Sequence, residues 1–580
     1  MKTLKKIYKL VKENKSNSIT FFIILMVFSS VLETMSIALL VPLISSIINE
    51  SSNSIIQSSI NSFILYFTEI FNFQFDNKKD LIFPILILFS FIVTLKVFVV
   101  LFFTNLQSEF KFNLINNIAK KIFSYYLNKP YNFFVKNNSS ILIRNSSAEI
   151  DICANSAVRI LTLINEIFLF MFILSFLFFF NLKVTLFFII VFSFSGGIFI
   201  LLTKKKMFKL AKDRQLFQGK TFQYAREAFG AIKEVIIYKK FNFFLHQYLD
   251  SYKKITLVNW SRDVLQVIPK HLLEYLMFIS IFFFIYISQS SFGKIDNIFT
   301  TLTIFAAAGY KLLPGFNRII TTIQQIKLSK PAIDIIYEET LGFKKDKQES
   351  KAILKNLNFE KSFEFKKISF SYEKDKKILD NLNFSFKKGE TIGIFGPSGG
   401  GKSTLMDLIT GVYQINSGEI FIDEKKIDKL NSAWSANIGY VPQFTYIFDG
   451  SFEKNIAFGI PEHEIDKIKL RSAIVNSGLE DLINSFNDKQ LKVIGEKGAS
   501  LSGGQRQRIG IARSLYLDPD IIILDESLNA LDLLTENKII ESIKKLNKTL
   551  IIISHRKSTL EKCQKIFKVE NKKINILSND

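Results

Sequence analysis

The 580-residue chain has few cysteines and histidines, and it has fewer acidic than basic residues. Its two cysteines, Cys153 and Cys563, match no metal-ligand spacing and are too few for a disulfide framework. His246, His271 and His463 form no cluster in the sequence either. We therefore expect neither a cysteine–histidine metal site nor a disulfide-stabilised scaffold.

Hydrophobic residues are abundant instead. Apolar residues make up 48% of the chain, 61 residues are phenylalanine and the mean hydropathy is +0.22, so membrane spans are expected. The net charge of +23 does not indicate a nucleic-acid partner, because no basic motif with interleaved aromatic residues is present. We attribute the charge to lysines on cytoplasmic loops and to attraction for anionic lipid headgroups.

The hydrophobic runs predict six membrane spans with both termini in the cytosol. The first run is too long for a signal peptide and has no clear cleavage site, so it should stay as a membrane helix. Lysine-rich segments after spans two and four fit helices that extend into the cytosol. The spans cover, in order, 18–48, 81–106, 160–180, 182–202, 272–288 and a run from 298.

Between the first two spans, helical periodicity predicts an external amphipathic helix at about 54–73. It either packs on neighbouring spans or lies in the outer membrane face, where a lipid tail could dock.

Three regions follow from the composition: a transmembrane domain at 1–325, a lysine-rich linker at 326–360 and a third region at 361–580. The third begins with short strands at 363–366, 368–372 and 382–386, and strands then alternate with helices. This pattern predicts an α/β domain preceded by a small antiparallel subdomain.

The stretch from Thr391 to Thr404 reads TIGIFGPSGGGKST. An apolar strand, a glycine-rich turn and a helix start occur there in the order of a phosphate-binding P-loop. Backbone amides should cradle the phosphates of ATP and Lys402 should reach their β and γ oxygens. The predicted contacts are Gly396, Pro397, Ser398, Gly399, Gly400, Gly401, Lys402, Ser403 and Thr404.

A second strand ends in two acids, Asp525 and Glu526. Asp525 should hold Mg²⁺ together with the Ser403 hydroxyl, because a buried acid at a strand end is costly without a cation. Glu526 is the candidate general base that polarises the attacking water.

The signature Leu501-Ser-Gly-Gly-Gln505 lies between the P-loop and this strand. In this order, the motifs resemble the nucleotide-binding domain of ABC transporters, and the whole chain resembles an ABC exporter half-transporter of the type IV fold. The resemblance implies an α-helical six-span transmembrane domain plus an α/β P-loop ABC nucleotide-binding domain with a small antiparallel β subdomain.

The resemblance also assigns roles to single residues. Tyr372 looks like the aromatic residue that stacks on adenine, and Gln443 like the glutamine that contacts Mg²⁺ and water. His555 looks like the histidine that touches the γ-phosphate, and Asp532 belongs to the nucleotide site. Two departures are Gly400, where Ser or Cys is usual, and Asn529-Ala-Leu-Asp532, which replaces Ser-Ala-Leu-Asp.

The signature implies a partner, because in this family it faces the P-loop of another chain. One P-loop and one signature per chain predict a head-to-tail homodimer with two ATP molecules between its domains. The signature residues Ser502, Gly503, Gly504 and Gln505 should cap the γ-phosphate of the ATP bound by the partner. The tetrapeptide Gly495–Gly498 resembles an exporter-type coupling loop, and short helical turns near 138–144 and 230–238 should touch the ATPase domain.

Cations inside the spans suggest a cargo site. Lys96, Lys270 and Lys311 should converge at one level, with Arg318 deeper. Their side chains either extend to the lipid headgroups or face the cytosol, or they form a cationic ring that binds an anionic cargo. The segments Phe28–Ser45 and Tyr310–Thr321 resemble the bacterial lipid-linked oligosaccharide flippase of protein N-glycosylation, which implies a polyprenyl-diphosphate glycan as cargo and the bacterial cytoplasmic membrane as location.

Three functions therefore compete: a flippase for a lipid-linked glycan, a general lipid or multidrug exporter of the same architecture, and a membrane protein that ATP merely gates. Glu526 and His555 argue against the third, since a gate needs binding more than turnover. The cofactors expected in every case are ATP and Mg²⁺.

Overall fold

The computed structural model describes residues 2–12, 18–40, 43, 82–180, 182–290, 298–350, 358–373, 376–485, 494 and 501–577. The chain forms two compact units. The first comprises Met1–Lys129 and Lys136–Asp346, and the second comprises Pro130–Val135 and Lys347–Asp580. The predicted external helix at 54–73 and the tetrapeptide 495–498 lie outside the described residues.

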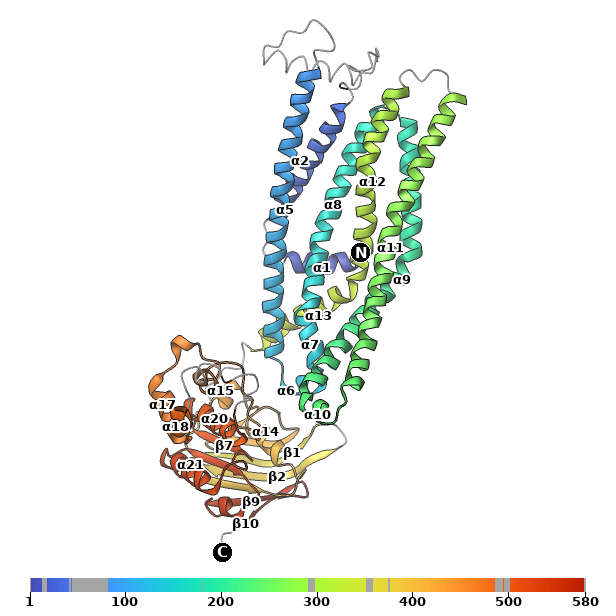
Figure 1. Cartoon of the computed structure of the whole chain (residues 1–580). Helices are drawn as coiled ribbons and strands as arrows, with labels where there is room; N and C mark the ends of the chain where they lie inside the picture. The colour runs from blue at the N-terminus through green and yellow to red at the C-terminus, as the bar shows by residue number, and fades with distance from the viewer. Residues whose placement is uncertain are drawn as a thin grey trace. The chain divides into compact units, whose positions relative to one another are not determined.

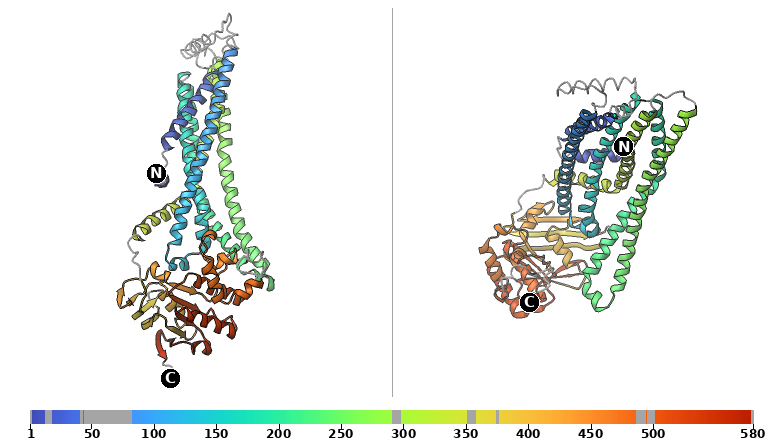
Figure 2. Two further views of the ribbon diagram at one scale, coloured as in Figure 1. Left: turned by 90° about the vertical axis from the view of Figure 1, so that its left-hand side faces the viewer. Right: turned by 45° about the horizontal axis from the view of Figure 1, so that its top comes forward.

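The first unit is helical, and its long helices run side by side (Figures 1 and 2). Its elements are α1 (Lys2–Lys12), α2 (Ser18–Ala38), α5 (Ile82–Leu127), α7 (Ser139–Ser146), α8 (Ala148–Phe180), α9 (Leu182–Gly230), α10 (Ile232–Ile237), α11 (Phe241–Ser290), α12 (Ile298–Leu328) and most of α13 (Lys330–Ser350).

Within the described residues, four helical stretches are long and apolar enough to cross a membrane: Thr20–Ala38, Ile82–Leu127, Ser139–Phe179 and Phe241–Phe282. They overlap the predicted first, second, third and fifth spans. The structure thus supports a helical membrane domain without fixing the number of spans at six.

Two further features concern the ends of these helices. Only residue 181 separates α8 from α9, which overlap the predicted spans three and four. Helices α5 and α9 also continue well past the predicted ends of spans two and four, to Leu127 and Gly230.

The second unit contains two sheets. The four-stranded antiparallel sheet has the order β2-β1-β4-β5, and the six-stranded sheet has the order β10-β9-β3-β8-β7-β6, in which only β10 runs antiparallel to its neighbour. The strands are β1 (Ser362–Ser371), β2 (Lys377–Lys387), β3 (Thr391–Phe395), β4 (Ser417–Ile422), β5 (Lys425–Ile427), β6 (Ile438–Val441), β7 (Ile521–Asp525), β8 (Thr549–Ile553), β9 (Lys565–Glu570) and β10 (Lys573–Leu577).

The first helix of this unit, α6 (Tyr131–Lys136), ends one residue beyond the segment Pro130–Val135. The other helices are α14 (Lys402–Ile409), α15 (Ser432–Ala436), α16 (Phe452–Ile456), α17 (Lys467–Asn476), α18 (Glu480–Ser485), α20 (Gly503–Tyr516), α21 (Leu533–Lys545) and α22 (Lys557–Leu560). A 3₁₀ turn lies at Glu462–Glu464. Strands β7 and β8 are buried along their whole length, as expected for a parallel sheet covered on both faces. This buried sheet fixes the strand ends that carry the candidate site.

One sequence-based expectation for this unit is corrected. The predicted strands 363–366 and 368–372 are one strand, β1, whose register shifts at Lys367, a residue with a left-handed φ of 50°. Such a bulge leaves the strand continuous although the alternation of apolar residues is interrupted.

The first ATPase-contacting turn is expected at 138–144, and its contact with the ATPase domain stays a prediction. A short helix, α7, does form there, but the segment that belongs to the second unit is Pro130–Val135. Its Tyr131 ring packs edge-on against Tyr413 with centroids 5.8 Å apart. An aromatic contact thus anchors the segment that precedes the expected turn. The turn predicted at 230–238 is the short helix α10, and its contact with the ATPase domain stays a prediction.

Candidate functional site

The glycine-rich loop connects the end of β3 to the start of α14. Gly396, Gly399 and Gly401 have positive φ angles of 154°, 76° and 104°. A Cβ atom on Gly396 would lie only 2.1 Å from the carbonyl oxygen of Val569, so a side chain cannot be accommodated there. The loop conformation therefore depends on glycine, and the nine predicted phosphate contacts, residues 396–404, are contiguous along it and the first turn of α14.

Lys402 is buried, and its ammonium group bonds back to its own loop. Nζ donates hydrogen bonds to the carbonyl oxygens of Gly396, at 2.8 Å, and Pro397, at 3.1 Å. The loop thus already curls around a positive charge. Ser403, the predicted Mg²⁺ ligand, is exposed in the next position.

Tyr372, the predicted adenine-stacking residue, lies directly after β1. Its hydroxyl is 3.0 Å from Thr404 Oγ1, and its ring contacts Tyr413 edge-on at 5.1 Å. The side chain is held at its hydroxyl end while 43% of the residue stays exposed, so a ring face remains available for a planar ligand.

Negative charge accumulates beside the loop. Tyr440 Oη donates a 2.9 Å hydrogen bond to Asp525 Oδ2. Burial, reinforced by Glu526, raises the pKa of Asp525, and burial, reinforced by Asp525, raises the pKa of Asp407 to about 6. A nearby cation would relieve this repulsion.

No group of three or more acid, histidine or cysteine side chains forms a ready-made metal site in the described part of the chain. Mg²⁺ does not require such a group, because proteins commonly bind it through one or two carboxylates together with substrate phosphates. The predicted donors Ser403, Asp525 and Gln443 have the hard oxygen atoms that Mg²⁺ prefers.

The three predicted catalytic side chains meet at Glu526. Gln443 Nε2 donates a 3.0 Å hydrogen bond to Glu526 Oε2, and His555 Nε2 lies 3.3 Å from Glu526 Oε1. Glu526 follows β7 with a left-handed φ of 48°, and His555 follows β8. Neighbouring strand ends thus bring together residues that are 29 and 83 positions apart in the chain.

The signature forms the start of α20. Ser502 is its N-cap and makes a reciprocal capping box with Gln505, with bonds of 3.2 and 2.7 Å. Ser502 and Gly503 are exposed, and Gly504 and Gln505 are half-buried. The helix start is therefore ordered by its own residues and presents free amide groups.

Several residues that sequence reasoning did not single out hold the segment 529–532. Gln507 Oε1 accepts a 3.1 Å bond from the Ala530 amide. Arg556 donates to the carbonyl oxygens of Asn529 and Leu531 and to the buried carboxylate of Glu536. Arg556 directly follows the predicted catalytic residue His555, and this position could have indicated from the sequence that it lies near the site. Asp532, predicted to belong to the nucleotide site, caps α21 by accepting a 2.9 Å bond from the Thr535 amide.

Two of the candidate cargo cations, Lys96 and Arg318, form ion pairs in the described part of the chain, and the cargo site itself stays a prediction. Lys96 Nζ lies 2.5 Å from the buried Glu33 Oε2, and Arg318 Nε lies 2.6 Å from the buried Glu166 Oε1. Lys270 is exposed and lies 4.0 Å from Glu274, and the side chain of Lys311 lies outside the described atoms. Sequence analysis overlooked Glu166, although a carboxylate inside a predicted span was a signal.

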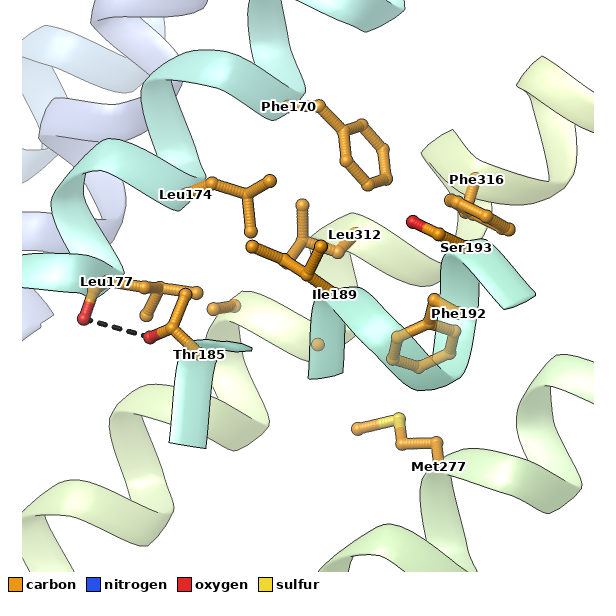
Figure 3. Close-up of a pocket in the computed structure, with 12 residues that line it drawn as sticks. Phe170, Leu174, Leu177, Thr185, Ile189, Phe192, Ser193, Met277, Leu312 and Phe316 are labelled. Carbon is orange, nitrogen blue, oxygen red and sulfur yellow. Dashed lines mark hydrogen bonds between the residues drawn. The ribbon is translucent and has the colours of Figure 1, made fainter. Parts of the chain in front are cut away.

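The first unit also contains an apolar pocket of about 70 Å³ between α8, α9, α11 and α12. Figure 3 shows side chains of α8, α9 and α12 around one space, with Met277 of α11 at its edge. Thr185 Oγ1 donates a 3.1 Å bond to the carbonyl oxygen of Leu177. We call this space the apolar pocket; its lining includes Phe170, Leu174, Phe192, Met277, Leu312 and Phe316.

Comparisons with known proteins agree with these features. Residues 379–529 match the ABC transporter family. The chain is 41% identical over 212 residues to an uncharacterised ABC transporter ATP-binding protein, YfiB, of Bacillus subtilis, a match that spans 36% of each protein. It is 27% identical over 475 residues, or 79% of each protein, to the ATP-dependent lipid A-core flippase of Escherichia coli.

The fold resembles the solved structure of a bacterial Atm1-family ABC exporter with ATP bound. The TM-score is 0.75 at 17% identity, and the match covers 97% of this chain and 95% of the other. This likeness shows the fold of both parts, the helical membrane domain and the P-loop domain.

Proposed function

We propose that this chain, an ATP-hydrolysing ABC translocase with an exporter fold, flips an amphipathic lipid across the bacterial cytoplasmic membrane. The observation that carries the proposal is the apolar pocket among four long helices, which suits a hydrocarbon chain better than a soluble solute. The E. coli lipid A-core flippase, which matches along 79% of its length, supports a lipid cargo as well.

Hydrolysis would use the residues gathered around Glu526. Glu526 would accept a proton from the attacking water, Gln443 would orient that water, and His555 would contact the γ-phosphate. Mg²⁺, held by Ser403, Asp525 and Gln443, would neutralise charge on the phosphates. Lys402 would exchange its two carbonyl partners for phosphate oxygens, and Tyr372 would stack on adenine.

The working unit would be a head-to-tail homodimer. The exposed start of α20 offers unpaired amides to an anion. In the head-to-tail arrangement of the family, that anion would be the γ-phosphate of an ATP molecule bound to the P-loop of the second chain. Both termini would lie in the cytosol, because the lysine-rich segments fall on that side under the positive-inside rule.

The specific cargo that we propose to test first is a polyprenyl-diphosphate glycan, for which the resemblance of the membrane segments is the support. The alternative is a general lipid or multidrug exporter. The ion pairs of Lys96 and Arg318 favour the broader lipid reading, since they leave less free positive charge for a diphosphate at those positions.

Translocation assays in proteoliposomes test the proposal. Wild-type protein should move a fluorescent amphipathic lipid between leaflets in the presence of ATP and Mg²⁺, and the Glu526→Gln variant should not. A parallel assay with a polyprenyl-diphosphate saccharide separates the specific cargo from the general one. An active ATPase that moves no lipid of either kind would overturn the lipid-flippase proposal.

A further inference from the structure

A second cavity, of about 340 Å³, lies between the same four helices as the apolar pocket. Arginines from three helices line it: Arg159 of α8, Arg214 of α9 and Arg262 of α11. Its other polar lining residues are Asn155, Asn259, Gln266, Gln325 and Ser329, and no carboxylate is among the lining residues. We call it the arginine cavity.

The arginine cavity carries unbalanced positive charge. Arg214 Nη2 lies 3.0 Å from the buried Glu149, and Arg262 Nη2 lies 2.9 Å from its neighbour Asp263. Arg159 has no hydrogen-bond or ion-pair partner within the described part of the chain, and it lies near enough to Arg262 for the two charges to repel. A bound anion would relieve that repulsion.

A neutral donor also points to a ligand. Gln266 Oε1 accepts a 3.2 Å bond from Gln325 Nε2, which fixes the orientation of the Gln266 amide. Its own Nε2 is buried and has no partner among the described residues. A buried donor without an acceptor is destabilising, so an acceptor atom at this position would be stabilising.

The spacing of the two cavities matches a membrane lipid. Arg159 and Leu174 lie fifteen residues apart on α8, and so do Arg262 and Met277 on α11. At 1.5 Å per helical residue, each pair is separated by about 22 Å along its helix. One leaflet with its headgroups is about 20–22 Å thick, half of a bilayer.

We propose that the arginine cavity binds the anionic headgroup of a lipid whose hydrocarbon chain extends into the apolar pocket. Arg159 and Arg262 supply the charge, Gln266 donates a hydrogen bond, and the four shared helices set the distance from head to tail. This inference rests on the proposed lipid-translocating function and names the chemical class of its cargo: phosphate-bearing amphipathic lipids rather than neutral ones.

The test uses the full-length protein in nanodiscs of phosphatidylcholine, with phosphatidylglycerol as the probe lipid and inorganic phosphate as the soluble anion. Binding is measured by native mass spectrometry, and translocation is measured in vesicles. The double variant Arg159→Gln, Arg262→Gln should weaken phosphatidylglycerol binding by about tenfold or more, because it removes two charge-assisted contacts. The variant Ser193→Phe fills the apolar pocket. It should weaken lipid binding but leave the affinity for inorganic phosphate unchanged.

Two controls keep the result interpretable. Lys205→Gln with Lys253→Gln removes two exposed charges from α9 and α11 and should keep wild-type affinity. Arg159→Lys with Arg262→Lys keeps the charge and should retain most of the binding, which excludes misfolding as the cause of the loss.

The outcomes distinguish the inference from the proposed function. If the glutamine variant binds and moves phosphatidylglycerol as wild type does, the inference fails while the flippase function stands. If inorganic phosphate displaces the lipid at equal concentration, the cavity is a site for a soluble anion and the lipid assignment fails. If wild-type protein moves no lipid at all, the proposed function fails first.

Discussion

Gln443 Nε2 donates a 3.0 Å hydrogen bond to Glu526 Oε2, although the two residues lie 83 positions apart in the chain. The parallel pairing of β6 with β7 creates this contact, since Gln443 follows β6 closely and Glu526 follows β7 directly. The glutamine is therefore placed to sense whether Glu526 is engaged with water and phosphate. A movement of the loop that carries Gln443 would change this hydrogen bond and so the position of Glu526, the candidate general base.

The first prediction concerns Glu526. Replacing it with Gln should lower ATP turnover by about 10²–10⁴-fold, the range that a general base contributes. ATP binding should persist, because the P-loop is untouched. Turnover is measured by phosphate release and binding by a fluorescent ATP analogue. Glu541→Gln, at an exposed position on α21, is the matched control and should behave like wild type. Normal hydrolysis by Glu526→Gln would show that the role is misassigned.

The second prediction concerns the loop backbone. Gly396→Ala should abolish nucleotide binding, because the new methyl group would collide with the Val569 carbonyl oxygen at 2.1 Å. Gly459→Ala is the control: Gly459 also has a positive φ, 80°, but its Cβ would meet no atom within 4 Å. The control should cost only the backbone strain of about 1–2 kcal/mol. Equal ATP affinity in the two variants would contradict the explanation.

The third prediction concerns the ion pair inside the membrane domain. Lys96→Met removes the cation 2.5 Å from Glu33, whose side chain is only 8% exposed. Breaking a buried pair costs about 3–5 kcal/mol, so the melting temperature in detergent should fall. Adding Glu33→Gln should recover much of the loss. Lys270→Met, which removes an exposed partner of Glu274, should change stability by less than about 1 kcal/mol. Similar melting temperatures for the Lys96 and Lys270 variants would argue against a structural role for the pair.

The fourth prediction is a pH dependence. Burial raises the pKa of the Cys563 thiol to about 11, so in the folded protein it stays protonated where an ordinary cysteine ionises. Since the thiolate is the nucleophile, native Cys563 in a Cys153→Ala background should react with maleimide about 100-fold more slowly at pH 8.5 than an exposed cysteine. Because the folded state holds this proton more tightly, the free energy of unfolding should fall as the pH rises from about 9 towards about 11.

The control for this measurement is Ser558→Cys in a chain that lacks both native cysteines, since Ser558 is exposed on α22. Equal reaction rates for Cys563 and the introduced cysteine would show that the thiol is accessible in the native state.

Local signals explain what the sequence predicted well. The P-loop and the signature are contiguous, so their spacing determines a strand, a turn and a helix start without knowledge of the rest of the fold. The alternation of strands and helices likewise indicated the α/β domain, and the hydrophobic runs indicated the helical membrane domain.

Long-range pairing explains what was missed. The ion pairs of Lys96 and Arg318 were not predicted, because nothing in the sequence shows that α2 presents Glu33 to α5, or α8 presents Glu166 to α12. The bulge at Lys367 depends on one dihedral angle, and the contact of Tyr131 with Tyr413 depends on how distant segments pack. Each of these features is a property of tertiary structure.

The carbonyl contacts of Lys402 give the pocket a means of discriminating among nucleotides. A nucleotide that reaches the ammonium group must offer oxygen atoms in place of these two carbonyl contacts. We therefore expect nucleotides that carry β- and γ-phosphates to be favoured over adenosine monophosphate, whose single phosphate has fewer oxygen atoms to offer.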